Sequence, residues 1–337
     1  MLLPFVLTAI QAKPWHLFCG GDIMLNGVSA KVPVFKNLNI PRDAIFYANQ
    51  EIPMTSVRER TSRKSAAEVA AKKQFILTAD PRHILNLSSA GVDVVSLGNN
   101  HAMDAGASGL KQMLGLLDKQ GIKHVGAGEN WAKAVEPAIV VAPDGTRVAF
   151  LSYLSFLSYE ALRKCTPATS TKPGIAVLTM LGKKGPKELK ILQAVLKNAR
   201  AKADVVVVAL HWGVERQPFP AAYQVALGRL FVDAGADVIL GAHPHVLQPA
   251  EVYKGKPIIY SLGNFVNPGG GSSAIYKLTF EKNKFLFGNI IPISYSGGRA
   301  SYSKRNPRDI SQSEPNFQVM FPSENSRPMT FKPMKNI

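Results

Sequence analysis

The segment 241–248, Gly-Ala-His-Pro-His-Val-Leu-Gln, constrains this chain more than any other stretch. It follows an apolar run, 237–240, that is typical of a short buried strand. Pro244 excludes a regular helix or a central strand between the two histidines, so His243 and His245 must project from a rigid loop. Ligands of α/β sheets bind at the carboxyl ends of strands, and this loop follows such an end.

Four other apolar runs also end in short polar motifs. An isolated His-x-His is often plain surface, and the other motifs are what make a site the better interpretation. They are Gly20-Gly21-Asp22, Asn49-Gln50-Glu51, Leu97-Gly98-Asn99-Asn100-His101 and Leu210-His211-Trp212-Gly213. Together the five motifs supply four histidines, one aspartate, one glutamate and several asparagines. We therefore expect one shared polar site at the ends of several strands.

The composition is that of a globular chain, with 46% hydrophobic and 19% charged residues among 337. No apolar run is long enough to predict a transmembrane helix. Lys and Arg number 40 against 23 Asp and Glu, and the net charge of +17 favours an anionic partner. The basic residues are dispersed, without a nucleic-acid module, so no nucleic-acid partner is expected. A generally basic protein without any anionic partner is the alternative.

Both ends of the chain are expected to lie outside the main domain, which spans 16–297. Residues 1–15 begin with an apolar stretch ending at Ala12 that resembles a secretory signal without its positive region. This stretch favours export to the periplasm or cell surface, although it could also be a first strand. Residues 298–337 are polar, proline-rich and net basic, which predicts a loosely packed or disordered tail.

Two further features carry only weak signals. Cys19 and Cys165 lack metal-ligand spacing; Cys19 is interpreted as a buried free thiol, with a Cys19–Cys165 disulfide as the alternative. Segment 56–73 carries charges of both signs and is expected to be a solvated loop or helix. A basic rim along a substrate groove is the less favoured interpretation of the same segment.

The order of the expected elements predicts a mixed α/β fold. From about 84 to 126, strands alternate with helices, as in parallel strands joined by crossover helices. Asp80-Pro81 predicts the start of a helix and Gly91 its end. Asp144-Gly145 predicts a type I′ hairpin, so antiparallel strands are expected as well. Other helices are expected at about 107–120, 187–201 and 221–234, and other strands at 44–48, 92–97, 122–125, 205–210, 274–280 and 285–293.

The side chains of the shared site indicate metal chemistry. Imidazole, carboxylate and amide oxygen together suit borderline divalent metals such as Zn, Mn, Fe, Co or Ni. No cysteine cluster is present, so a structural zinc site is not expected. The donors are more than one tetrahedral ion needs, and they fit two ions with a carboxylate between them. Two-metal sites activate water and stabilise in-line displacement, which favours hydrolysis of a phosphoester or acyl bond.

The motifs in chain order resemble the CapA family of bacterial capsule and poly-γ-glutamate biosynthesis proteins, relatives of the calcineurin-like metallophosphoesterases. They are Gly-Asp, Asn-x-Glu, Gly-Asn-Asn-His-x-x-Asp-x-Gly, His-Trp-Gly-x-Glu, His-Pro-His-Val-x-Gln and Tyr-Ser-Leu-Gly-Asn-Phe. The resemblance covers about residues 16–266 and is specific, because several long motifs occur in the right order. It implies an α/β fold, namely a four-layer α-β-β-α sandwich with mixed sheets and the site at the strand ends.

The resemblance also implies roles for single residues around two divalent ions, either Mn, Zn or Fe. One ion would be held by Asp22 and His245, the other by Asn100, His211 and His243, and Glu51 would bridge them. His101 would face the substrate as acid or charge stabiliser, oriented by Asp104, for which a helix N-cap is the alternative role. Asn99, Glu215 and Asn264 are expected near the substrate, with a turn-shaping role for Asn99 and a surface role for Glu215 as alternatives.

One position departs from the wider superfamily. The histidine that follows the first aspartate by two residues in that superfamily is Met24 in this chain. One metal would then lack a ligand, which puts standard phosphatase chemistry in doubt.

Three functions remain open from the sequence. The first is a metal-dependent hydrolase acting in the production or anchoring of capsule or poly-γ-glutamate, an anionic polymer that suits the basic charge. The second is a non-catalytic polyanion-binding accessory of a membrane synthase. The third is a phosphoesterase acting on nucleotides or phosphorylated sugars. The four motif histidines favour a working metal site.

Overall fold

The computed structural model describes residues 13–61, 63–156, 158–180, 185–303 and 329–331. Within these ranges the strands form two large sheets and one small pair, β5 (Ala127–Gly128) with β8 (Gly174–Ile175). The first sheet has nine strands in the described parts of the chain. Its order is β16 (Arg299–Tyr302), β15 (Lys284–Ser296), β14 (Gly270–Glu281), β1 (Trp15–Ile23), β2 (Ile45–Gln50), β3 (Val94–Ser96) and β4 (Lys123–Val125), with β13 (Asn264–Val266) beside β1 and β17 (Met329–Phe331) beside β15.

The second sheet has six strands in those same described ranges. Its order is β11 (Leu247–Tyr253), β12 (Lys256–Leu262), β10 (Val238–Ala242), β9 (Val205–Trp212), β7 (Arg147–Ser155) and β6 (Ala138–Val141). Both sheets mix parallel and antiparallel pairs: β9 runs parallel to β7 and β10, whereas β11 and β12 form a hairpin.

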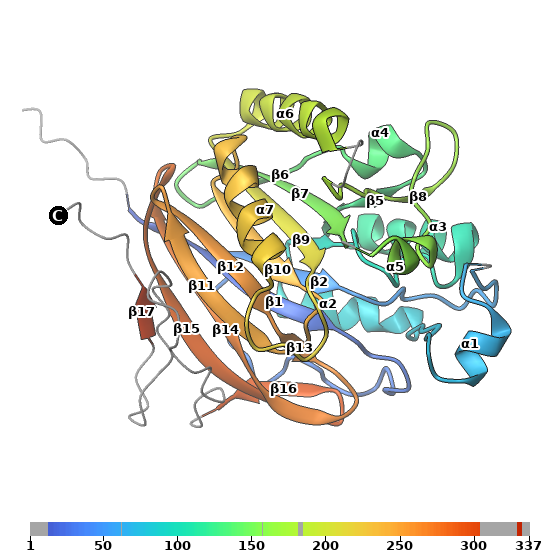
Figure 1. Ribbon diagram of the computed structural model, residues 1–337. Helices are drawn as coiled ribbons and strands as arrows, with labels where there is room; N and C mark the ends of the chain where they lie inside the picture. Colours follow the sequence, from blue (N-terminus) through green and yellow to red (C-terminus); the bar gives the residue numbers. More distant parts are fainter. Residues whose placement is uncertain (1–12, 62, 157, 181–184, 304–328, 332–337) are drawn as a thin grey trace, which may run out of the picture.

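Side chains that alternate along each strand build three apolar layers. Cys19 of β1 and Val207 of β9 lie in a layer between the two sheets. Phe18 faces the opposite way, toward the helices α2 (Ile84–Ala90) and α3 (Gly106–Lys119). Val208 likewise faces α6 (Gly185–Lys202) and α7 (Ala222–Asp233). The architecture is therefore the expected four-layer α-β-β-α sandwich with mixed sheets, and Figure 1 shows α6 and α7 together on one side of it.

Three short helices complete the described fold: α1 (Ala66–Ala70), α4 (Trp131–Ala134) and α5 (Tyr159–Arg163). A 3-10 turn at Pro81–His83 precedes α2, capped by the Asp80 carboxylate as expected, and Gly91 ends α2 with a φ of +78°. None of the described helices is long and apolar enough to span a bilayer.

Most expected elements are confirmed, including parallel β2, β3 and β4 and the strands and helices that follow. The type I′ turn is wrong in detail. Gly145 has a φ of +87°, but Asp144 does not have the positive φ that a type I′ turn also requires, and the loop closes instead between Ala142 and Thr146. Segment 158–173, where none of the expected helices or strands fell, contains α5.

The sequence predicted a domain boundary at 297 and segments outside the domain at both chain ends. Residues 299–302 continue the first sheet as β16, so the sheet extends past the expected boundary at 297, and β17 pairs with β15. Residues 1–12, 304–328 and 332–337, which include most of the expected leader and tail, lie outside the described residues. Cys19 and Cys165 are both buried free thiols.

Candidate metal centre

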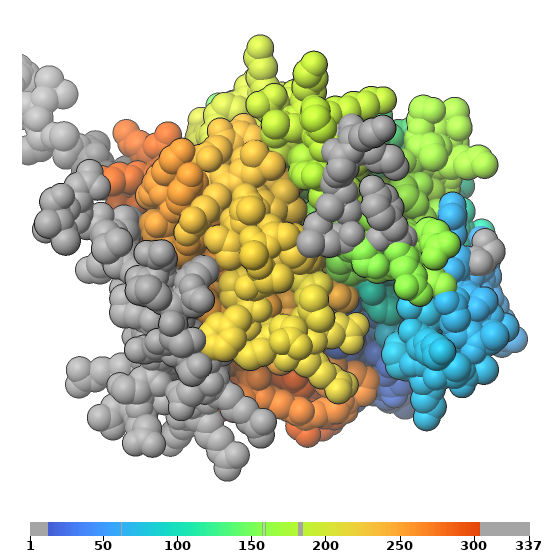
Figure 2. Space-filling model, viewed as in Figure 1, coloured from blue at the N-terminus to red at the C-terminus, as the bar shows by residue number. Residues whose placement is uncertain are grey.

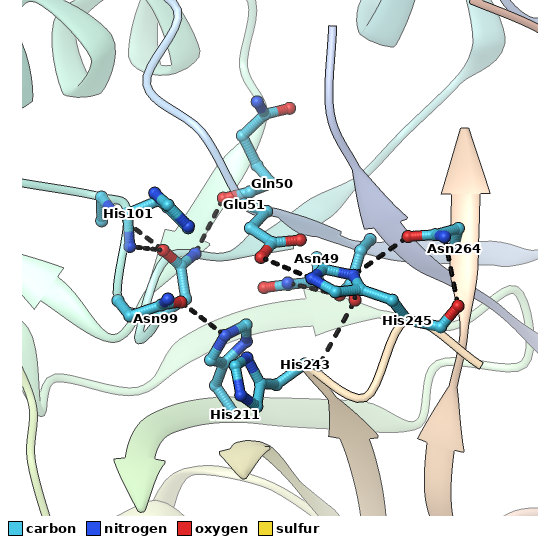
Figure 3. A network of polar contacts seen from close by, with 12 residues as sticks. Asn49, Gln50, Glu51, Asn99, His101, His211, His243, His245 and Asn264 are labelled. Atoms are coloured by element: carbon cyan, nitrogen blue, oxygen red, sulfur yellow. Dashed lines mark hydrogen bonds and ion pairs between the residues drawn. The ribbon is translucent and has the colours of Figure 1, made fainter. Parts of the chain in front are cut away.

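Five strands of the two sheets bring the polar motifs together at their carboxyl ends. Asp22 is the penultimate residue of β1, and Glu51 follows β2 directly. His211 lies in β9 opposite Ala242 of β10, so His243 emerges beside it, and the two imidazole centroids are 4.8 Å apart. Figure 3 shows Glu51 and His245 pointing toward each other and His211 beside His243.

Asp22 is fully buried and held from three sides. Its Oδ1 accepts a hydrogen bond from Asn49 Nδ2 at 2.7 Å, and its Oδ2 accepts one from the backbone N–H of His243 at 3.3 Å. His245 Nδ1 lies 3.1 Å from the same Oδ2. Gly21 makes this position possible, because a Cβ there would lie 1.9 Å from the carbonyl oxygen of Gly263.

The His-Pro-His loop is strained at both histidines. His243 has a φ of +96° and His245 a φ of +59°, a region that non-glycine residues rarely occupy. Each such residue costs about 1–3 kcal/mol, and strain of this kind clusters at functional sites. Both histidines lie in a non-helical loop between β10 and β11, as expected.

Potential metal-ligand atoms gather in overlapping groups within 4.8 Å of one another. One group is Asp22, Glu51 and His245, and another is Glu51, His211 and His243, so Glu51 belongs to both. Both Glu51 carboxylate oxygens and the Nδ1 atoms of His211 and His243 are buried without a hydrogen-bond partner in the described structure. Buried polar atoms normally have partners, so the unpartnered carboxylate and imidazole atoms have the chemistry of divalent-cation ligands, with Glu51 common to both groups.

The electrostatics of these side chains agree with that chemistry. Burial, followed by the charge of Asp22, raises the pKa of Glu51 to about 8. Burial lowers the pKa of His243 to about 3 and that of His211 well below its usual range, which keeps both imidazoles neutral and able to bind a metal. Burial also acts to lower the pKa of His245, but the carboxylates of Glu51 and Asp22 outweigh it and raise that pKa.

Asn100 contacts this centre through His211. The His211 Nε2–H donates to Asn100 Oδ1 at 2.7 Å, which leaves His211 Nδ1 with its lone pair free. Asn100 Oδ1 thus lies at Nε2, the other ring nitrogen from the unpartnered Nδ1, and a role for Asn100 as a metal ligand stays a prediction from the sequence.

His101 and Asp104 form a buried pair beside the metal-ligand groups. Their closest atoms, Nδ1 and Oδ2, are 2.6 Å apart, so Asp104 orients the ring as expected. The alternative role of Asp104 as a helix cap is not seen, since α3 has Ala105 at its N-cap and no side-chain cap. Burial lowers the pKa of His101, and the hydrogen bond that the ring donates to Asp104 opposes this shift.

Lys64 joins this pair and was missed by the sequence reasoning. It lies in segment 56–73, and the expectation of a solvated segment is wrong for this residue, whose side chain is 2% exposed. Its Nζ lies 2.5 Å from Asp104 Oδ1 and 3.3 Å from His101 Nδ1. Nothing in the alternating charge run distinguished Lys64 from its exposed neighbours.

The three residues expected near the substrate have different surroundings. Asn99 is fully buried and its amide bonds three backbone groups, from Gln50, His101 and Ala102, which favours its alternative role in shaping the turn. Asn264 bonds His245 through both its amide atoms and so positions that ring. Glu215 is exposed, with a carboxylate oxygen near the His243 and His245 rings, and it remains a candidate for substrate contact.

Phe156 forms an apolar wall on one side of the histidines. Its ring centroid is 4.6 Å from that of His243 and 6.0 Å from that of His211. On the face drawn in Figure 2, the surface is hollowed between the yellow segment after β9 and the blue segment around α1. The remaining histidines lie elsewhere: His16 bonds Thr279, His83 bonds the carbonyl of Val28, and His124 lies beside Asp118.

Comparison with known proteins decides the family. The model of the family described as bacterial capsule synthesis protein PGA_cap matches residues 16–269, which is more than half of the chain. The chain belongs to this family. Its members include the proteins that the sequence motifs resembled, and the α/β sandwich seen here is the metallophosphoesterase-like fold expected from that resemblance.

Curated relatives of this PGA_cap chain carry related names. The capsule biosynthesis protein CapA of Bacillus anthracis is 35% identical over 234 residues, covering 68% of this chain and 54% of the relative. The PGA biosynthesis protein CapA of Bacillus subtilis strain 168 is 33% identical over 270 residues, covering 78% of this chain and 67% of the relative. A probable polyglutamine synthesis accessory protein of Mycobacterium tuberculosis is 28% identical over 207 residues, covering 61% of this chain and 53% of the relative. The chain thus spans about half to two thirds of the length of these relatives.

Met24 is the departure within this PGA_cap site. It follows β1, is partly buried, and packs against the apolar layer that also contains α2 and α3. A thioether packed there is no substitute for an imidazole ligand, so the ion beside Asp22 would have fewer protein ligands than the superfamily pattern provides.

Proposed function

We propose that this protein acts in capsule or poly-γ-glutamate production as a metal-dependent hydrolase whose two divalent ions share Glu51. The observation that carries the proposal is the position of Glu51, common to two ligand groups and without a hydrogen-bond partner in the described structure for either carboxylate oxygen. The polymer context is supported by the names of the Bacillus relatives. The net charge of +17 suits a polycarboxylate.

The residues around the ions would have separate roles in hydrolysis. Two divalent ions bound here would activate a water molecule and polarise the bond to be broken. His101, when protonated, would give a proton from Nε2 to the leaving group, while Asp104 holds its Nδ1. Phe156 covers the side of His211 and His243 and would keep bulk water away from them. Asn264 would keep His245 turned toward Glu51.

A non-catalytic accessory that binds the anionic polymer for a membrane synthase is the second candidate. Met24 favours it, because a missing ligand weakens one metal position. The exposed cations of segment 56–73 favour it too: Arg58, Arg60, Arg63, Lys72 and Lys73 have no ion pair with any described residue. Either candidate would act at the periplasm or cell surface, where capsular polymer is assembled. A phosphoesterase acting on nucleotides or phosphosugars is the third candidate.

One assay separates the candidates. The Mn²⁺-loaded protein is incubated with poly-γ-glutamate or with an aryl phosphoester, and both cleavage and polymer binding are measured. We expect polymer cleavage by the wild type, a loss of about 10²-fold or more in kcat for His101→Gln, and no change for the control His16→Gln, which lies outside the site. Polymer binding without cleavage by the metal-loaded wild type would instead establish the accessory role. Cleavage of the phosphoester alone would establish a phosphoesterase.

A further inference from the structure

The segment between β2 and α2 leaves the first sheet and returns to it, and we call residues 55–79 the strap. Its two ends are joined by the bridge between Met54 and Ala79 and by the hydrogen bond from Thr55 N–H to the Ala79 carbonyl. Between them it crosses the start of α3, where Ser108 N–H donates to Glu59, and reaches the candidate site at Lys64. The strap therefore carries one buried ammonium group to a site built otherwise from strand ends.

The Lys64 ammonium group is buried and makes its contacts within the site. Besides Asp104 Oδ1, its Nζ donates to the carbonyl oxygen of Phe75 at 2.8 Å, within the strap itself. Asp104 Oδ2 in turn accepts from the Leu77 backbone N–H at 2.8 Å and contacts His101 Nδ1. Both oxygens of the buried carboxylate thus meet donors, which is how a buried charge pair is stabilised.

We propose that Lys64 is a positioning residue for His101. Asp104 receives a hydrogen bond at each oxygen, from the Lys64 ammonium at Oδ1 and from the Leu77 backbone N–H at Oδ2, so the carboxyl group acts as an acceptor on both sides. His101 Nδ1, 2.6 Å from Oδ2, must then carry the proton, since two acceptors do not approach so closely. Nε2, which has no partner in the described part of the chain, is left as the nitrogen that faces substrate. That Nε2 faces a substrate rests on the proposed function. The position of the proton on Nδ1 does not depend on any catalytic activity.

Removing the ammonium should reverse this arrangement. In Lys64→Met the buried Asp104 lacks its counter-charge, and the neutral acid, which donates from one oxygen, becomes the favoured form. The acid can then donate to Nδ1 and move the ring proton to Nε2. Lys64→Arg keeps the positive charge and should retain the wild-type tautomer.

A matched control exists on the same strap. Glu68 of α1 forms an ion pair with Lys164, the residue that follows α5. This pair connects the strap to that part of the fold and does not contact His101. Lys164→Met therefore also removes a lysine–carboxylate pair from the strap but should leave the His101 ring unchanged. A general loosening of the strap would affect both variants alike.

The tautomer can be read from the long-range ¹H–¹⁵N spectrum of the ¹⁵N-histidine-labelled full chain, with His101 assigned by His101→Gln. We expect a protonated Nδ1 and an unprotonated Nε2 in the wild type, Lys64→Arg and Lys164→Met, and the opposite pattern in Lys64→Met. An Nε2–H tautomer in the wild type, or an unchanged His101 in a folded Lys64→Met, would overturn the proposal. The wild-type spectrum decides the question even if Lys64→Met does not fold.

Where cleavage is observed, the same variants give a second readout. Lys64→Met should lower kcat by about 10–100-fold with KM unchanged, while Lys164→Met stays within about 2–3-fold of the wild type. Equal losses in both variants would assign Lys64 a merely structural role. If no substrate is cleaved, the proposed hydrolase fails, but the tautomer of His101 still tests the role of Lys64.

Discussion

Among single residues, Glu51 has the surroundings least like those of an ordinary glutamate. It is fully buried, Asp22 lies nearby, and the nearest cationic partner, His245 Nε2, is 3.6 Å from its Oε1. A bound metal ion would supply the positive charge that the side chains around the Glu51 carboxylate do not fully provide. The stability of the metal-free protein should therefore depend on pH in a way that metal removes.

We expect the metal-free protein to lose stability as the pH rises from 7 to 8. Burial raises the pKa of Glu51 from 4.5 in the unfolded chain to about 8, so in this window the folded state holds a proton that the unfolded state has released. His245, whose pKa is also raised, acts with the same sign. The lowered pKa values of His101, His211 and His243 act with the opposite sign near pH 6.5, where the unfolded imidazoles are half protonated. Above pH 7 these rings are mostly neutral in both states and contribute less.

The expected slope is roughly 1 kcal/mol per pH unit for each such proton, measured by urea unfolding in the presence of a chelator. Glu51→Gln should flatten it, because the amide has no proton to release. A stability that rises between pH 7 and 8 in the metal-free wild type would contradict the assigned environment of Glu51.

Single elements of the fold depend on close backbone approach near the site. Gly241 of β10 is one such case, since a Cβ there would lie 1.9 Å from the carbonyl oxygen of Tyr260 in β12. Gly115 in α3 is the opposite case, exposed and with no atom within 4 Å of an added Cβ.

We therefore expect opposite effects from the same substitution. Gly241→Ala should separate β10 from β12 and lower the free energy of unfolding by about 3 kcal/mol or more, or prevent folding. Gly115→Ala should raise it by roughly 0.5–1 kcal/mol, because alanine is the better helix former. Thermal unfolding of the two variants provides the measurement, and a tolerated Gly241→Ala would show that the strand spacing is not as described.

Elements were predictable from sequence where the signal is local. Apolar runs located β9 and β10, the Asp80 cap located the 3-10 turn before α2, and Gly91 located the end of α2. The turn at Asp144 was predicted with the wrong geometry because the dipeptide alone does not fix the loop length, and here three residues rather than two separate the closing pair.

At the scale of the whole molecule, the two sheets bring distant residues together. β1 pairs with β13 so that Asp22 lies beside Asn264, and β9 pairs with β10 so that His211 lies beside His243. Spacing in sequence cannot show which of these side chains contact one another. The strand ends predicted a shared site, and only the resemblance to a family assigned single residues to positions within it.

Residues at strand ends could be predicted from the sequence, whereas residues that matter through packing could not. The six expected metal ligands share one site, because each follows a recognisable strand end. Lys64 and Phe156 were missed since their importance arises from packing across the fold, Lys64 against Asp104 and Phe156 against His243. The role of Asn264 in holding His245 likewise becomes visible only when β13 is seen beside β1.

The central claim, that Glu51 is shared by two metal ions, is tested most directly by the metal content of the purified protein. Elemental analysis of wild type reconstituted with Mn or Zn is compared with His243→Ala and with the control His124→Ala, whose histidine lies beside Asp118 away from the site. We expect about two divalent ions per chain in the wild type and the control, and about one or none in His243→Ala. One ion in the wild type would indicate a site reduced by Met24, and no bound metal after reconstitution would contradict the account.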